Sequence, residues 1–283
     1  MNESLDGSSL HAVPALKKSP RMPVLFLGHG SPMNALDDNS YYRSWQSLGA
    51  EFGSILPRPQ LILCISAHWL THGWWLTAMS QPKTIHDFGG FPKELFEQQY
   101  PAPGEPAAAQ GISQLVRQRS SQPLGLDLGW GLDHGAWGVL KPMFANADIP
   151  VIQLSMDYSR APEEHFALAR QLMALRDRGV LIVGSGNIVH NLRHMQPGAT
   201  DRSAFDWALE FDQLIGDDLQ RGNLLALQDF QKLGQVAVMA QPTHEHFLPL
   251  LYAAGAVDPR EPLRFFNTDF QAGSISMRSV VWG

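Results

Sequence analysis

Short apolar runs alternate with amphipathic segments along most of this 283-residue chain, and this alternation limits the folds that it can adopt. Apolar runs bounded by glycine, proline or polar residues are typical of buried strands. They occur at 23–27, 61–66, 150–155, 180–184, 235–240 and 274–282. Helical patterns lie between them, at 105–118, 161–179 and 201–222. Strands that alternate with helices predict an α/β fold with a central, mostly parallel or mixed sheet and helices on both faces.

The chain has the organisation of a single domain. It contains no internal repeat or linker, so we expect a flexible N-terminal tail over residues 1–20 and one folded domain over residues 21–283. The tail lacks the apolar block of a signal peptide, and no apolar run approaches the ~18 residues of a membrane span. We therefore expect a cytoplasmic protein that does not enter membranes. The net charge of −6, without a basic stripe, argues against nucleic acid as a partner.

Histidines recur where predicted strands end. The chain has 11 of them, and the following come after strand-like runs: His29, His68, His190, and the pair His244 and His246. Ligands of open α/β sheets bind at the carboxyl ends of the strands, so this convergence predicts a site at that edge. The one cysteine, Cys64, lies inside an apolar run, and metal ligands here must therefore be His, Asp or Glu.

The other histidines have weaker signals. His134 lies in a glycine-flanked loop beside Asp133, and His86 lies in the long stretch 69–104, which is rich in Trp, Gly and Pro. A stretch of that length without clear elements is usually functional, although a hydrogen bond within the loop is the simpler role for His86. No role is expected for the histidines in the tail, in a loop, on an exposed helix face and in a flanking position: His11, His72, His165 and His194.

The cluster at residues 244–246 leaves three candidates open. Pro249 places the start of a helix near residue 246, because proline is tolerated only in a first helical turn. Residues 242–246 would then be extended, with His244 and His246 on one side and Glu245 on the other. Side chains alternate less strictly at a turn than within a strand, so any of the three could reach a site.

Three familiar catalytic motifs do not match. The segments GHGSP (28–32) and GSGNI (184–188) do not supply the G-x-S-x-G of a nucleophile elbow. The segment HEHFL has Leu248 where a zincin helix needs its second histidine, and no lysine follows GHGS as a phosphate loop requires.

Six motifs in order carry a family resemblance. They are LFLGHGSPMN, SAHW, TIHDFGGFP, DHGAWGVL, SGNIVHNL and PTHEHFLPLL, and together they span nearly the whole chain. The sequence resembles the class III extradiol ring-cleaving dioxygenases, in particular their small single-chain branch, the 4,5-DOPA extradiol dioxygenases. The resemblance implies an α/β domain with a metal ion at the strand ends, and it makes residues 21–283 the catalytic domain.

The resemblance also implies roles for individual residues. His29, His68 and His246 correspond to metal ligands, and His190 to a fourth pocket histidine that binds the metal or serves as an acid–base group. His134 corresponds to the catalytic histidine that meets the substrate hydroxyl. Larger enzymes of the class use a glutamate as third ligand, which keeps Glu245 and His244 as alternatives to His246.

The reaction implied is the insertion of both atoms of O2 into a catechol ring, next to the diol. For DOPA, 4,5-cleavage gives a seco-DOPA that cyclises towards betalamic acid. One divalent ion per chain is expected: Fe(II) for dioxygenase activity, with Zn2+ able to occupy the site as purified. The partners implied are a small catecholic substrate and O2, in a monomer or small homo-oligomer.

Two alternatives remain at this point. The same histidines would hold Zn2+ and activate water in a zinc hydrolase. They would also bind a metal in a non-catalytic protein on the same scaffold.

Overall fold

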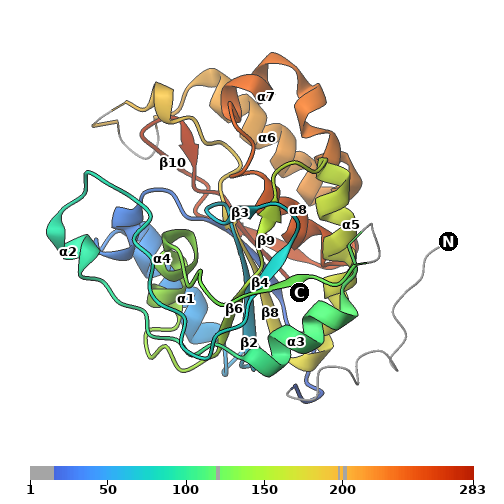
Figure 1. Cartoon of the computed structure of the whole chain (residues 1–283). Helices are drawn as coiled ribbons and strands as arrows, with labels where there is room; N and C mark the ends of the chain where they lie inside the picture. Colours follow the sequence, from blue (N-terminus) through green and yellow to red (C-terminus); the bar gives the residue numbers. More distant parts are fainter. Residues whose placement is uncertain (1–15, 119–121, 197, 200–202) are drawn as a thin grey trace.

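A mixed sheet forms the centre of the molecule (Figure 1). The computed structural model describes residues 16–118, 122–196, 198–199 and 203–283. Across the sheet of these residues the strands are, in spatial order, β6 (Val151–Gln153), β2 (Leu61–Ser66), β8 (Val180–Gly186), β1 (Val24–Gly28), β12 (Ser279–Trp282) and β9 (Leu263–Phe266). The first four are parallel, and the last two run antiparallel to their neighbours. The predicted α/β fold with a mixed sheet is therefore confirmed.

Helices cover both faces of this sheet. They are α1 (Ser40–Glu51), α2 (Lys93–Phe96), α3 (Pro106–Leu115), α4 (His134–Met143), α5 (Pro162–Leu172), α6 (Asp206–Gln220), α7 (Gln235–Ala240) and α8 (Leu248–Gly255). Short 3-10 helices lie at Pro32–Ala35, Met173–Arg178, Leu192–His194 and Leu224–Leu233. In Figure 1, α1 and α4 lie on one side of the sheet, and α3, α5 and α8 lie on the other. Among the described residues, no helix has the length and hydropathy that crossing a bilayer would require.

Three small two-stranded sheets lie outside the central sheet of the described residues. They pair β3 (Leu70–Thr71) with β7 (Met156–Asp157), β4 (Trp75–Thr77) with β5 (Gly125–Asp127), and β10 (Phe270–Gln271) with β11 (Ile275–Ser276). The stretch 69–104, in which the sequence showed no clear elements, thus holds two of these short strands and the single turn of α2.

Alternate residues of the central strands enter two separate cores. In β1, Val24 and Phe26 belong to the core under α3, α5 and α8, whereas Leu25 and Leu27 belong to the core under α1 and α4. This follows from the two-residue period of a strand, which sends successive side chains to opposite faces. Both faces are buried, which explains why the strand sequences are continuously apolar.

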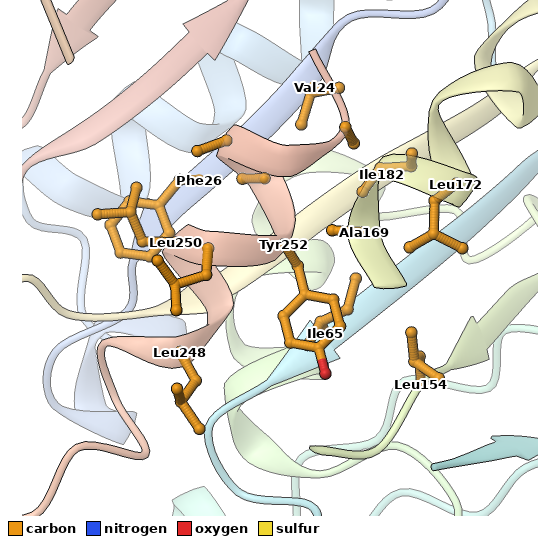
Figure 2. Packing of buried hydrophobic residues seen from close by; sticks show 14 of the residues in the cluster. Val24, Phe26, Ile65, Leu154, Ala169, Leu172, Ile182, Leu248, Leu250 and Tyr252 are labelled. Carbon is orange, nitrogen blue, oxygen red and sulfur yellow. The ribbon is translucent and has the colours of Figure 1, made fainter. Parts of the chain in front are cut away.

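The core beneath α8 is the larger of the two. Figure 2 shows Phe26 and Ile182 of the sheet packed with Leu250 and Tyr252 of α8 and Leu172 of α5. Fully burying side chains of this size stabilises a fold by about 1.5–3 kcal/mol each, so α8 is firmly fixed to the sheet. The loop that leads into α8 is held with it.

One predicted strand is wrong. Residues 235–240 form α7 rather than a strand. The apolar run is only six residues long, too short for periodicity to separate a strand from a helix turn. Its buried residues are Ala237 and Ala240, three apart as on one helix face, whereas Val238 is 59% exposed. The remaining strands are found with shifted ends, and the run 274–282 is divided between β11 and β12.

Two of the helices that were not predicted, α1 and α4, begin at clear capping residues. Asn39 caps α1 by accepting a hydrogen bond from the backbone N–H of Tyr42, and Asp133 caps α4 by accepting one from Ala136. His134, expected in a loop, is therefore the first residue of α4. The glycines around it hid the helix signal, because glycine is a weak helix former.

The beginning of the described chain packs on the domain. Leu16 is buried in the core under α5, and the backbone N–H of Ser19 donates to the carbonyl of Asp177. Most of the predicted tail, residues 1–15, lies outside the described residues. The boundary at residue 20 stays a prediction.

His165 is buried, not exposed as expected from its helix. The indole N–H of Trp74 donates to the hydroxyl of Tyr252 at 2.6 Å, so the phenolic proton is free to bond Nδ1 of His165 at 2.8 Å. Burial lowers the pKa of His165 from 6.5 to about 4. A neutral histidine in this core therefore stabilises the fold only while the pH stays above its unfolded pKa.

We expect stability to fall on acidification, with a measurable part caused by His165. Between pH 6.5 and 4 the unfolded chain binds a proton at this residue and the folded chain does not, so stability rises with pH there. The full contribution is about 3 kcal/mol. The variant His165→Asn keeps a hydrogen-bond acceptor for Tyr252 but cannot titrate. Its free energy of unfolding, measured with urea at several pH values, should therefore depend less steeply on pH than that of the wild type. The same pH dependence in the variant and the wild type would contradict this expectation. Comparing the pH dependence, rather than the stability at one pH, cancels the packing changes that the substitution itself causes.

Candidate metal centre

Three imidazole rings meet at the carboxyl edge of the sheet. His29, His68 and His246 each offer one ring nitrogen, and these atoms lie within 4.8 Å of one another. The Nε2 atoms of His29 and His68 are 3.4 Å apart. The ring centroids of all three pairs are separated by 5.1 to 5.2 Å. Three nitrogen donors at this spacing can share a single cation.

The segment GHGSP turns the chain immediately after β1. Gly30 has a φ of +59°, which glycine adopts without strain, and a Cβ there would lie 2.3 Å from Oε1 of Gln271. Ser31 then caps the 3-10 helix that follows, and its backbone N–H donates to Gln271. The turn therefore presents His29 at the end of β1, while His29 N–H still donates to the carbonyl of Gly186.

His246 reaches the site by another route. It does not follow a strand, because residues 235–240 are helical. Instead, its carbonyl accepts a hydrogen bond from the N–H of Asn187, directly beyond β8. A Cβ on Gly186 would lie 2.2 Å from that carbonyl, so glycine is required for this close approach. The prediction that four strand ends each deliver a histidine is wrong in this respect: His29, His68 and His190 follow strands, and His246 lies in the turn just before α8.

Each of the three rings has its second nitrogen occupied. Ser185 Oγ lies 3.0 Å from Nδ1 of His29 and donates its own proton to the carbonyl of Gly135, so it accepts from His29. Glu245 Oε1 lies 3.1 Å from Nδ1 of His246. Asp87 Oδ2 lies 3.2 Å from Nδ1 of His68. Acceptors on Nδ1 leave Nε2 unprotonated, which is how proteins usually orient histidine ligands.

Two of the rings, those of His29 and His246, are held in the neutral state that binds cations. Burial, followed by the neighbouring histidines, lowers the pKa of His29 and of His246 well below the ordinary value of 6.5. Neutral imidazole is a good ligand for Fe2+ and Zn2+. The donor set therefore fits the divalent ion expected from the sequence.

The three candidates at residues 244–246 occupy different places. Only His246 joins His29 and His68. Glu245 lies behind it and also accepts a hydrogen bond from Thr243 Oγ1 at 2.9 Å. The ring of His244 stacks on Tyr158, with centroids 4.5 Å apart, outside the cluster.

His190 flanks the three-nitrogen cluster. Its ring stacks on that of His246, with centroids 3.5 Å apart and planes 8° from parallel. One of its nitrogens lies within 4.8 Å of ligand atoms of Glu245 and His246. Burial lowers the pKa of His190 to about 4. A neutral imidazole at this position is able either to bind a metal or to accept a proton.

His134 lies on the opposite flank. Its ring centroid is 3.9 Å from that of His68 and 5.8 Å from that of His29. Burial lowers its pKa as well. Asp87 Oδ1 accepts the backbone N–H of His134 at 3.0 Å and lies 3.0 Å from its Nδ1. Sequence reasoning missed Asp87 and Ser185, although Asp87 follows His86 in one of the motifs that carry the family resemblance.

An aromatic cluster stands beside His134. The ring of Phe88 lies 5.5 Å from that of His134, and Phe91 and Phe96 pack against Phe88 at 5.4 and 5.0 Å. The Nε2 of His86 is 2.9 Å from the carbonyl of Gln98, in agreement with the loop hydrogen bond considered for it. The apolar surface of this cluster is suited to the face or edge of an aromatic ring.

Known proteins resemble this chain over nearly its full length. It is 47% identical to a 4,5-DOPA dioxygenase extradiol of Escherichia coli K12, across 95% of this chain and 97% of that protein. It is 34% identical to a 4,5-DOPA dioxygenase extradiol of Beta vulgaris, across 90% of this chain and 94% of that protein. The crystal structure of an uncharacterized Escherichia coli K12 protein superposes with a TM-score of 0.77 at 43% identity, covering 93% of this chain and all of that one.

The family model of the catalytic LigB subunit of aromatic ring-opening dioxygenases matches residues 23–274. This confirms the resemblance that the six motifs carry. The match includes every histidine of the cluster, from His29 to His246. The chain belongs to this LigB family and is an extradiol ring-opening dioxygenase.

Proposed function

We propose that the protein opens the ring of a DOPA-type catechol by 4,5-cleavage, with Fe(II) held by His29, His68 and His246. The observation that carries this proposal is the convergence of three imidazole nitrogens between two further histidines. Both oxygen atoms of O2 would enter the product, a seco-DOPA that cyclises towards a betalamic-acid-type compound. The names of the Escherichia coli and Beta vulgaris relatives support DOPA as the first substrate to test.

The metal ion has a defined part in this proposal. Bound Fe2+ supplies open coordination positions and the redox change that chemistry with O2 requires. The protein supplies the metal ligands, the groups that carry protons and the apolar side chains that surround the substrate ring. No protein thiolate is involved, since the single cysteine, Cys64, is buried in the core under α1 and α4.

His134 is proposed as the acid–base group. Its Nδ1 faces Asp87, which favours the tautomer with an unprotonated Nε2. That nitrogen is able to take the proton of a catechol hydroxyl and later return it to the product. A neutral imidazole can take this proton, and the imidazolium that forms can return it.

His190 is proposed as a second pocket group, beside His246. Its stacking on His246 would hold the ring plane fixed while one nitrogen remains directed into the site. It would act as a fourth ligand or as a proton carrier on the side opposite His134.

Phe88, Phe91 and Phe96 are proposed to wall the aromatic ring of the substrate. Together they form an apolar surface beside His134. A ring placed there is shielded from water, which strengthens the polar contacts made at its diol end.

Metal exchange tests the proposal. The protein loaded anaerobically with Fe(II) should consume one O2 per DOPA and form a yellow ring-opened product, measured with an oxygen electrode and by absorbance. The zinc-loaded protein should bind catechols without oxygen uptake, because Zn2+ has no accessible redox change. A panel of 4-substituted catechols would show whether DOPA or another ring is preferred. Absence of oxygen uptake with every catechol, together with efficient ester or amide hydrolysis by the zinc form, would contradict the proposal.

A further inference from the structure

Asp87 lies between two histidines with different proposed tasks. Its Oδ2 is 3.2 Å from Nδ1 of His68, and its Oδ1 is 3.0 Å from Nδ1 of His134. The contact with His134 is close, although its angle is not that of an aligned hydrogen bond. Donor atoms of all three residues lie within 4.8 Å of one another. One carboxylate therefore faces a proposed metal ligand with one oxygen and the proposed acid–base group with the other.

The backbone around Asp87 is anchored. Ile85 donates its N–H to the carbonyl of Leu132 at 2.7 Å, and its own carbonyl accepts the indole N–H of Trp137 at 2.8 Å. Thr84 Oγ1 accepts the N–H of Tyr100 at 3.0 Å. These bonds tie the loop to α4 and to the segment after α2. The carboxylate consequently has little freedom to move away from the two rings.

The ionised carboxylate of Asp87 interacts with two imidazole rings. Burial alone would raise the pKa of its carboxyl, but the contacts with His134 and His68 lower it well below the usual range. Within the part of the chain that the structure describes, its ion-pair contacts are these two rings. A carboxylate beside an imidazole nitrogen favours a proton on that nitrogen.

We propose that Asp87 is a positioning residue that fixes the orientation and the Nδ1–H tautomer of His68 and His134 together. Both rings then present an unprotonated Nε2 to the same space. This inference rests on the proposed function, because it gives His68 and His134 the tasks of ligand and proton carrier. It adds that the two tasks depend on one side chain.

The two oxygens are not equivalent, and this makes a selective variant possible. The backbone N–H of His134 donates to Oδ1 at 3.0 Å. In Asp87→Asn the amide oxygen should keep that position, so the amide N–H2 group would face Nδ1–H of His68. Two donors cannot face each other, and His68 must rotate or change tautomer. Asp87→Ala removes the acceptor from both rings, whereas Asp87→Glu retains the charge.

The zinc-loaded protein provides a readout that does not depend on turnover. We expect Asp87→Asn to weaken zinc binding by about 10- to 100-fold, the usual effect of removing a partner of a histidine ligand. Histidine ring 15N spectra of the zinc form should show a changed pattern for His68 and an unchanged one for His134. Both patterns should change in Asp87→Ala, and Asp87→Glu should restore part of the affinity. Glu97→Gln, which alters an exposed carboxylate paired with Lys93, is the matched control.

Failure of the inference about Asp87 and failure of the proposed function would give different results. Wild-type zinc affinity and unchanged ring spectra in folded Asp87→Asn and Asp87→Ala would overturn the inference. If Asp87→Ala does not fold, Asp87→Asn and Asp87→Glu still decide it through affinity and spectra. If the iron form of the wild type turns over no catechol, the proposed function fails. The effects of Asp87 on zinc affinity and tautomers would nevertheless still support its positioning role.

Discussion

Replacement of His29 by alanine should weaken metal binding by about 100-fold, so that the metal is lost on dialysis while the protein remains folded. His29 supplies one of the three converging nitrogens, and Ser185 fixes its tautomer from behind. Structural zinc sites with four ligands are worth about 10–16 kcal/mol, so one ligand contributes roughly 3 kcal/mol, or about a 100-fold change in affinity. Metal analysis after dialysis and a zinc competition titration measure this loss, and circular dichroism reports the fold. His68→Ala should behave in the same way.

His244→Ala is the matched control for this experiment. His244 is close in sequence to His246 but stacks on Tyr158, away from the three-nitrogen cluster. It should keep its metal. Full metal occupancy in His29→Ala would remove this residue from the proposed ligand set, and loss of metal in His244→Ala would point to His244 as a ligand instead.

His134→Ala should retain iron and bind catechol but lose turnover. Alanine is a good helix former, and Asp133 still caps α4, so the helix should persist. A positioned acid–base group typically contributes ~10²–10⁴-fold to the rate, and kcat should fall by that order. Steady-state oxygen uptake gives kcat, and metal analysis of the same sample gives occupancy.

The control for His134 is His72→Ala, which alters an exposed histidine. Its kcat per iron should equal that of the wild type. A near-normal kcat in His134→Ala would make His134 a structural residue, and a loss of iron in that variant would assign it to the metal rather than to proton transfer.

The central sheet was largely predictable from sequence. Strands such as 61–66 are continuous apolar runs between polar or glycine boundaries, and burial on both faces produces that signal directly. The segment 235–240 is also mostly apolar, but it forms α7, in which only Ala237 and Ala240 are buried. Six residues do not distinguish a period of two from a period of 3.6, so tertiary packing decided its structure.

The site was predictable in part. His29 and His68 follow parallel strands of the mixed sheet, and the general rule about strand ends was sufficient to predict that they lie close together. His246 was identified by family resemblance, since its position depends on a backbone contact with Asn187 that no local pattern encodes. Asp87 and Ser185 act across 47 and 156 residues of sequence on His134 and His29 respectively. Such pairings arise from the folded topology and leave no spacing signal.

The close approach at Gly186 sets a limit on directed evolution of this enzyme. Any larger residue there would press on the carbonyl of His246 and shift the ring that completes the three-nitrogen cluster. Mutant libraries aimed at new ring substrates would therefore lose most members if they randomised the end of β8. Phe91 and Phe96 are better places for diversity, because both pack against Phe88, whereas Phe88 itself contacts the ring of His134. Libraries there should leave the neighbouring Asp87 fixed, so that substrate range changes without disturbing His68 and His134.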